Sequence, residues 1–398
     1  MTALTDFAAA QKISADDPSF RRVCLALILS GFSAFSALYC VQPILPVFAT
    51  DFHIAPAAAS LAISISTMAL AVGLIFAGPL SDAIGRKPVI LASMTASGAL
   101  MIASVFAPNW HALVALRAVL GFLLGGITAI NLTYLAEEVD LSSLGMATGF
   151  VLAGNSVGSM SARLFVGVAT DYVDWRWPMA CLGLFSLAAA ALMAAWLPAS
   201  RHFEPAPLSL GATLRNYGRH LSSPGLAPAF VAGFLLMGSF VAFFNYVGFR
   251  LLSPPFDLSQ TVVGLISLVF LPSSWAAIAA GRLSDRVGPT RVHVGAIAAM
   301  ILGLALTAAP SFWTLGAGTL LFALGFFAAH STATGHVGRT ASVARAQATS
   351  MYQIAFYVGA SVAGTVGGLF WQALGWNGII LMLGLMLAAA AVNGCKLR

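Results

Sequence analysis

The chain has 398 residues, of which 59% are apolar and 8% are charged. Charged residues make up roughly 25% of a soluble globular protein, so this chain has too few to cover a surface in water. The composition excludes an ordinary water-soluble enzyme, a disordered chain and a nucleic-acid-binding protein. Together with a mean hydropathy of +0.91, it indicates a polytopic membrane protein. The net charge of +6 fits basic loops on the cytoplasmic side of a membrane.

The apolar segments, taken in chain order, predict an all-α fold with twelve membrane-spanning helices, because a span needs about 20 apolar residues. The predicted spans are 22–47, 56–80, 88–107, 110–135, 143–169, 177–197, 226–249, 260–281, 290–309, 312–335, 346–373 and 376–395. We expect 1–20 to be a cytoplasmic tail, 21–197 and 225–398 to be two six-helix bundles, and 198–224 to be a polar cytoplasmic linker.

The basic residues predict the orientation of these spans. If both termini are cytoplasmic, the cytoplasmic segments contain 15 of the 19 Lys and Arg residues. Arg176 and Arg250 fall on the other side, and Arg117 and Arg163 fall within spans. This asymmetry is what the positive-inside rule predicts. We therefore expect a monomeric, multi-pass protein of the cell membrane, which is the inner membrane if the source is Gram-negative.

One sequence motif occurs twice. Gly78-Pro79-Leu80-Ser81-Asp82-Ala83-Ile84-Gly85 recurs 203 residues later as Gly281-Arg282-Leu283-Ser284-Asp285-Arg286-Val287-Gly288. Near an offset of 205, Gly154-Asn155-Ser156-Val157 matches Gly359-Ala360-Ser361-Val362. A nearly constant offset indicates that a six-helix unit is duplicated. Two such halves around a central site are typical of secondary transporters.

The segment 78–87 resembles the loop 2–3 signature of the major facilitator superfamily, and 281–291 resembles its weaker copy in loop 8–9. Arg117-Ala118-Val119-Leu120-Gly121 is similar to the fourth-helix motif of proton-coupled exporters, and Pro43-Ile44-Leu45-Pro46 to a first-helix motif of the twelve-span drug:proton antiporters. Segments 39–43, 154–158 and 357–361 resemble an inner-membrane subgroup related to arabinose-efflux-type permeases. The resemblance implies a major facilitator fold and export of a small molecule. The fifth helix departs from the antiporters, because it lacks their Gly-Pro pair.

The repeated loop residues are candidates for a gate at the cytoplasmic side. An aspartate is stabilised near the positive N-terminus of a helix, so we expect Asp82 to face the start of helix 11, near residues 347–350. By the repeat, Asp285 is expected to face the start of helix 5, near residues 142–143. We expect the glycines to allow close packing and a tight turn, and the basic residues to anchor at lipid headgroups. The candidate gating residues are Gly78, Asp82, Gly85, Arg86, Lys87, Gly281, Asp285 and Gly288. An ordinary turn with inside-positive charge is the alternative.

Two arginines, Arg117 and Arg163, lie within predicted spans. A charge at mid-membrane costs about 2.5–3.5 kcal/mol, so it normally faces a cavity or a partner. We expect Arg117 to face a cavity. Arg163 either faces a cavity, extends to the outer interface, or pairs with Asp171 or Asp174.

All thirteen acidic residues fall in tails, loops or helix ends. His330 is therefore a candidate proton carrier, because an unperturbed histidine titrates near pH 7. A structural histidine held by a hydrogen bond is the alternative for this position. The carboxylates Asp51 and Asp257, at the mouths of the cavity, are further candidates for proton coupling.

The lack of mid-span carboxylates also bears on the substrate. A cavity with arginines and no carboxylate repels cations, so we expect the substrate to be a small neutral or anionic organic compound. Polar side chains at mid-span suit a mostly apolar pocket, although each can instead bond between helices. The candidate substrate-binding residues are Tyr39, Gln42, Asn131, Tyr134, Asn155, Asn245, Tyr246, Gln353 and Tyr357.

No motif of an enzyme is present. The sequence has no Gly-x-Ser-x-Gly elbow, no His-Glu-x-x-His and no Walker motif, and its four cysteines lie far apart. We expect no enzymatic activity, no cofactor and no metal. The sequence predicts a secondary transporter that works by alternating access, with a proton as coupling ion and export as direction. Uptake or facilitated transport is one alternative, and a non-transporting receptor or structural protein is another.

Overall fold

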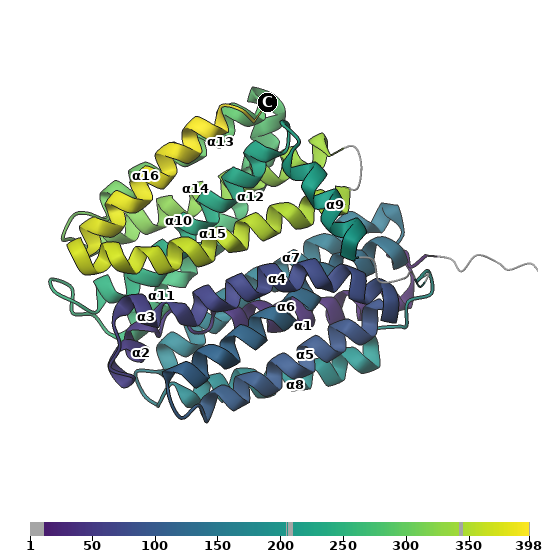
Figure 1. Cartoon of the computed structure of the whole chain (residues 1–398), viewed down its shortest axis with the longest axis horizontal. Helices are drawn as coiled ribbons and strands as arrows, with labels where there is room; N and C mark the ends of the chain where they lie inside the picture. Colours follow the sequence, from purple (N-terminus) through teal and green to yellow (C-terminus); the bar gives the residue numbers. More distant parts are fainter. Residues whose placement is uncertain (1–11, 204, 206–209, 342–344, 398) are drawn as a thin grey trace, which may run out of the picture.

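The computed structural model describes residues 12–203, 205, 210–341 and 345–397. Its helices form two bundles that lie side by side (Figure 1). The first bundle contains α1 (Pro18–Tyr39), α2 (Leu45–Asp51), α3 (Pro56–Ala59), α4 (Leu61–Ile84), α5 (Arg86–Val105), α6 (Trp110–Glu138), α7 (Leu141–Ala169) and α8 (Arg176–Trp196). The second contains α10 (Ala227–Leu251), α11 (Gln260–Leu265), a short 3-10 helix (Ile266–Val269), α12 (Phe270–Val287), α13 (Pro289–Leu306), α14 (Phe312–Thr340), α15 (Arg345–Leu374) and α16 (Trp376–Gly394).

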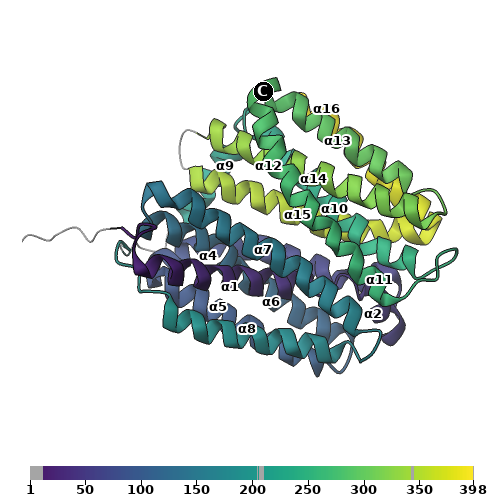
Figure 2. The same ribbon diagram turned by 180° about the vertical axis from the view of Figure 1, so that it is seen from behind.

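The long helices give the molecule two ends. We call one the linker end: it carries α9 (Leu210–Leu221), the turn at Gly85, the start of α1 and the end of α16 (Figures 1 and 2). We call the other the distal end: it carries α2, α3 and the start of α11. The contacts of the site described below are placed relative to these two ends.

The predicted all-α, polytopic fold is confirmed. By length and hydropathy, ten stretches of the described chain qualify as membrane spans, and one of them, Gln347–Gly394, covers both α15 and α16. Helix α7 has 29 residues, as many as α6 and α14, but it is not one of these ten stretches. Its polar residues, among them Asn155 and Arg163, lower its hydropathy. With α7 included, the described chain has the twelve long helical segments that the sequence predicts.

One predicted boundary is wrong. The first span does not run to residue 47, because α1 ends at Tyr39 and α2 begins only at Leu45. Pro43 and Pro46 lack the backbone N–H that a continuous helix would need. The segment 198–224 predicted as the linker contains the helix α9, whose last turn carries Arg219 and His220.

The sequence repeat is also a repeat of structure. Gly85 joins α4 to α5 with φ +100° and ψ 156°, and Gly288 joins α12 to α13 with φ +93° and ψ 143°. Each glycine N–H donates to a serine carbonyl four residues earlier, at 2.9 Å for Ser81 and 3.0 Å for Ser284. A positive φ is strained for any residue with a Cβ, so the turn requires glycine. The two motif copies therefore build the same turn in each bundle.

The second repeated motif sets matching helix contacts. A Cβ on Gly154 of α7 would lie 2.8 Å from the carbonyl oxygen of Ile28 in α1. A Cβ on Gly359 of α15 would lie 2.1 Å from the carbonyl oxygen of Phe234 in α10. Small residues allow helix backbones to approach this closely. Helix α7 thus packs on α1 as α15 packs on α10.

Candidate functional site

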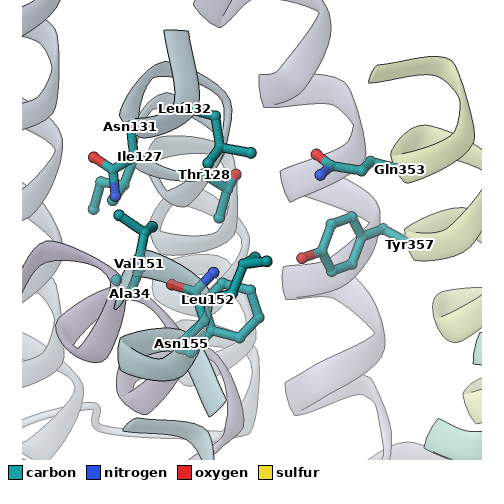
Figure 3. A pocket seen from close by; sticks show the side chains of 12 residues that line it. Ala34, Ile127, Thr128, Asn131, Leu132, Val151, Leu152, Asn155, Gln353 and Tyr357 are labelled. Carbon is teal, nitrogen blue, oxygen red and sulfur yellow. The ribbon is translucent and has the colours of Figure 1, made fainter. Parts of the chain in front are cut away.

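A cavity of about 40 Å³ lies between the two bundles. Figure 3 shows Gln353 and Tyr357 of α15 pointing toward a wall formed by α6 and α7. The residues that line it are Gly31, Ala34, Phe35, Ile127, Thr128, Asn131, Leu132, Val151, Leu152, Asn155, Gln353 and Tyr357. Four of the predicted substrate-binding residues, Asn131, Asn155, Gln353 and Tyr357, are therefore brought together here.

The cavity is small compared with the binding pockets of drug-sized ligands. Pockets for drug-sized ligands are typically ≈ 300–1,000 Å³, whereas about 40 Å³ holds only a few water molecules. A drug-sized molecule therefore fits this cavity only if the bundles move apart.

Two amide groups in the cavity wall have unmet hydrogen-bonding capacity. The side chain of Asn131 donates to Ser30 Oγ at 2.7 Å, and its Oδ1 has no partner among the described residues. Asn155 Oδ1 is likewise buried without a partner in the described structure. A buried polar atom without a hydrogen bond is costly, so these groups are suited to bind water or the polar part of a ligand.

Arg163 lies two helical turns beyond Asn155 on α7 and is 4% exposed. Its Nε donates to Gln42 Oε1 at 2.7 Å, and its Nη1 donates to the carbonyl and the hydroxyl of Ser159. The guanidinium lies 4.3 Å from the ring centroid of Tyr39 and 5.0 Å from that of Phe270. No acidic residue of the described chain forms an ion pair with it. The proposed pairs with Asp171 and Asp174 are therefore not formed.

Gln42 links this arginine to the second bundle. Its Nε2 donates to Asn245 Oδ1 of α10 at 2.8 Å and approaches the carbonyl of Val241 at 3.4 Å. Gln42 is 2% exposed and lies in the break between α1 and α2. Arg163, Gln42 and Asn245 therefore form a continuous polar bridge between the two bundles. Sequence reasoning selected all three residues but not their connection.

Arg117 has a different place from the one predicted. It is fully buried, and it donates to the carbonyls of Ala37 and Leu38 at 2.7 Å and of Ala62 at 3.1 Å. The first two carbonyls belong to the last turn of α1, which has no following helical N–H groups. Arg117 thus caps α1 instead of lining the cavity.

Three of the selected tyrosines, Tyr39, Tyr134 and Tyr246, also lie outside the cavity lining. The hydroxyl of Tyr134 donates to the carbonyl of Pro198 at 3.1 Å, which fixes the start of the linker. The hydroxyl of Tyr246 donates to the carbonyl of Gly364 at 2.9 Å, which joins α10 to α15. Both are interhelical or loop bonds, the alternative noted for each candidate.

His330 is held by an aromatic cluster in the second bundle. Its Nδ1 lies 2.9 Å from the hydroxyl of Tyr352, and its ring lies 4.8 Å from that of Phe356 and 5.8 Å from that of Phe326. It is not among the residues that line the cavity. In this state His330 is therefore part of the aromatic cluster and not of the cavity wall.

The repeated loop of the first bundle forms an ion-pair network at the linker end. Arg86 is buried and pairs with Asp82 and with Glu137, whose Oε1 lies 2.6 Å from Arg86 Nη2. Lys87 donates to the carbonyls of Ala194 at 2.9 Å and Leu197 at 2.5 Å. The expected headgroup anchors are thus internal contacts, and Lys87 caps the end of α8.

Among the residues that the structure describes, the helix-start contacts expected for the two aspartates are not formed in this state. Asp82 pairs with Arg86 of its own bundle. Asp285 is exposed, and the start of α7 is capped by Asp140, which accepts from Ser142 N at 2.7 Å. This bond lowers the pKa of Asp140.

The first glycine of each motif copy does not mark close packing, contrary to the expectation. A Cβ added to Gly78 or to Gly281 would meet no atom within 4 Å. Only the last glycine of each copy, Gly85 and Gly288, is required by the backbone of the turn.

The distal end is closed by contacts that the sequence did not suggest. Asp171 accepts from the backbone of Gln260 at 3.1 Å and of Thr261 at 2.7 Å. Gln260 Nε2 donates to the carbonyl of Pro43. A Cβ on Gly167 would lie 2.5 Å from Gly264 Cα, so α7 and α11 touch through their backbones. Asp171 directly follows a span, which is the one sequence signal for this role.

A second hollow, of about 270 Å³, lies on the outside of the first bundle. Its lining is mainly apolar and includes Phe32, Phe165 and Phe185. Phe165 is 43% and Phe185 38% exposed. In a bilayer this surface faces lipid chains, so we assign it no role in substrate binding.

Comparison with known proteins agrees with the sequence motifs and the two-bundle fold. The chain matches the family model of the Major Facilitator Superfamily over residues 27–257 and 239–397. It is 44% identical to the inner membrane transport protein YnfM of Escherichia coli (strain K12) over 388 residues, which cover 98% of this chain and 93% of that protein. It is 40% identical to the MFS-type transporter YybF of Bacillus subtilis (strain 168), over 94% of this chain and 92% of that protein.

Solved transporters share the fold. The nucleoside transporter NupG superimposes with a TM-score of 0.76 at 15% identity, covering 94% of this chain and 99% of that chain. A partially occluded, inward-open structure of the xylose transporter XylE from E. coli gives a TM-score of 0.73 at 14% identity, covering 94% and 97%. The chain belongs to the Major Facilitator Superfamily, and it is a multi-pass membrane transporter of that type.

Proposed function

We propose that this transporter works by alternating access and exports a small neutral or anionic organic compound in exchange for protons. The observation that carries the proposal is the cavity whose wall comes from both bundles, with polar groups of α6 and α7 facing Gln353 and Tyr357 of α15. A site shared by two halves changes its accessibility when the halves rock against each other.

The proposed orientation places the linker end in the cytoplasm. Exposed basic residues lie at this end, among them Arg215, Arg219, Arg282 and Arg286, as the positive-inside rule requires. The named contacts between the bundles, such as that of Asp171 with Thr261, lie at the distal end. The cavity would then open toward the cytoplasm when the bundles separate at the linker end.

Asp82 is proposed to act when the linker end closes. In the present state it is held by Arg86, and its side chain is 44% exposed. On closure it would exchange this partner for the N-terminus of α15 in the other bundle. Such a carboxylate contributes ~0.3–1 kcal/mol when exposed, which is enough to bias two states of similar free energy.

The substrate class follows from charge. Arg163 is a buried cation, and the cavity-lining residues include no carboxylate. Cationic compounds would be repelled, while the amides of Asn131 and Asn155 can orient a neutral or anionic molecule. For the proton, His330 is the proposed carrier within the spans, since the acidic residues lie at helix ends and in loops.

The test is direct flux in proteoliposomes. The purified chain is reconstituted, and compounds that inhibit growth of a cell lacking the gene are offered with and without a pH gradient. We expect substrate and protons to move in opposite directions. Substrate flux should be faster when the proton gradient drives protons in the direction opposite to the substrate. Flux that ignores the gradient would indicate facilitated transport, and inertness toward all compounds in both directions would favour a receptor.

A further inference from the structure

We infer that Arg163 selects the substrate by charge: an anionic group of the substrate binds its guanidinium in place of Gln42 Oε1, and this exchange breaks the bridge from Gln42 to Asn245. The inference rests on the proposed function and narrows its substrate class to organic anions. It also links binding to the contact between the two bundles.

The first support is the missing counter-charge. Arg163 is almost fully removed from solvent, and its described partners are a glutamine oxygen, a serine hydroxyl, a backbone carbonyl and two aromatic rings. All of these are neutral. A buried cation without an anion is strongly disfavoured. Arg117 also has only neutral partners, but three carbonyls accept from its guanidinium and it is fully buried. Arg163 instead lies on the same helix as Asn155, which lines the cavity.

The second support is the geometry around the guanidinium. This group offers five N–H donors in one plane, a pattern that matches a carboxylate. Gln42 Oε1 accepts from Nε at 2.7 Å, so it occupies the place of one carboxylate oxygen. The bond from the guanidinium to Gln42 has one charged partner, whereas a carboxylate supplies a second charge and can accept two parallel N–H bonds, so it can displace the amide. The rings of Tyr39 and Phe270 would flank the body of such a ligand.

The third support is the position of Gln42. One end of its amide contacts Arg163, and the other donates to Asn245 Oδ1 in the second bundle at 2.8 Å. The adjacent carbonyl of Pro43 accepts from Gln260 Nε2, also of the second bundle. When a ligand takes the place of Oε1, the side chain is no longer held in the orientation that reaches Asn245. Ligand binding therefore weakens contacts that close the distal end.

The approach to Arg163 follows one face of α7. Asn155, Ser159 and Arg163 succeed one another at four-residue spacing, so they lie one above the other on the helix. Asn155 lines the cavity, and Ser159 contacts Arg163. A ligand that enters the cavity reaches the guanidinium along this face once the bundles separate.

The test uses three probes with the same ring and different charge: benzoate, benzamide and benzylamine. The full-length protein is purified in detergent, and its melting temperature is measured with each probe. We expect benzoate to raise the melting temperature of the wild type, and benzamide and benzylamine to leave it unchanged. Equal stabilisation by benzamide, or no stabilisation by benzoate, would overturn the inference.

Two variants locate the effect. Arg163→Gln removes the cation, and Gln42→Glu keeps it but supplies an anion from the protein itself at nearly unchanged volume. Both should lose the benzoate shift. Because Gln42→Glu gives Arg163 a counter-charge, we expect it to fold even if Arg163→Gln does not. Retention of the benzoate shift in Gln42→Glu would contradict displacement of Gln42.

The same probes separate this inference from the proposed function. If benzoate binds through Arg163 but no probe or metabolite crosses proteoliposomes, the charge selection stands and transport fails. If the reconstituted protein carries benzamide as fast as benzoate, transport stands and the selection by Arg163 is wrong.

Discussion

The carboxylate of Asp171 in the first bundle caps the helical segment that begins beside Thr261 in the second, with Oδ2 at 2.7 Å from the Thr261 N–H. That segment continues through α12 to Val287, so its positive end faces the aspartate. The contact joins residues 90 positions apart in the chain. It lies at the distal end, where the bundles are closed.

Asp171→Asn should loosen the distal end. Partial burial acts to raise the pKa of Asp171, but hydrogen bonds from Thr261 and Gln260 hold it below its ordinary value of 3.8. The carboxylate therefore stabilises the closed form fully above the ordinary pKa, and this stabilisation is lost as the pH falls through the lowered one. At neutral pH we expect the neutral variant to lose ~0.3–1 kcal/mol of closure, a roughly two- to fivefold shift.

The measurement is maleimide labelling of Cys40, which is fully buried in the break after α1. Cys181 and Cys395 are exposed and are first replaced by serine. We expect faster labelling in Asp171→Asn than in the wild type at pH 7, and a smaller difference below about pH 4. Equal rates at pH 7 would show that this cap does not hold the distal end.

Gly167→Ala should have a larger effect at the same end, because its Cβ would lie 2.5 Å from Gly264 Cα. No backbone can accept this contact unchanged, so α7 and α11 must separate. Gly149→Ala on the same helix is the matched control, since nothing lies within 4 Å of its Cβ. We expect Cys40 to be labelled faster in Gly167→Ala than in the wild type, and at the wild-type rate in Gly149→Ala.

Arg117→Ala should destabilise the protein without a specific effect on substrate. It would leave the buried carbonyl of Leu38 without its donor and would remove one donor each from the carbonyls of Ala37 and Ala62, which also accept from Cys40 Sγ and Ser66 Oγ. Each buried acceptor that loses its partner costs about 1–3 kcal/mol. We expect a large fall in melting temperature and partial recovery in Arg117→Lys. A stable variant with selectively altered substrate affinity would restore the cavity role that the sequence predicted.

Substitutions of Asp82 and of Glu137 should have different effects, although both residues contact Arg86. Glu137→Gln removes the negative charge from the residue that accepts more hydrogen bonds from Arg86 than Asp82 does. We therefore expect a loss of stability. Asp82→Asn should instead reduce transport while expression stays unchanged, because Asp82 is the residue proposed to change partners. Flux and melting temperature are measured for both. Unchanged flux in Asp82→Asn would remove its gating role.

The fold could be predicted from sequence because hydropathy, basic loops and the repeated motif each report on long segments. The motif copies ending at Gly85 and Gly288 do form equal turns. The polar candidates of α6, α7 and α15 that line the cavity could also be found, since polar residues in a span are rare and each needs a reason.

The parts of the site that the sequence did not predict depend on where α1 ends. The apolar pattern extends the predicted first span through Cys40 to residue 47, so it assigns the carbonyls that Arg117 caps to helical bonds. The same break places Gln42 between Arg163 and Asn245, a relation between three distant segments that no local pattern contains. The role of Asp171 is hidden for the same reason, because its partner Thr261 lies in another bundle.

The polar face of α7 also has a consequence for biogenesis. Its hydropathy falls short of that of the other long helices, so during synthesis the segment would partition poorly into lipid by itself. We expect it to leave the translocon as a hairpin with α6 or α8, when Arg163 first meets neutral partners instead of hydrocarbon. Chemistry that serves recognition thus limits how autonomously this part of the polypeptide can be integrated into the bilayer.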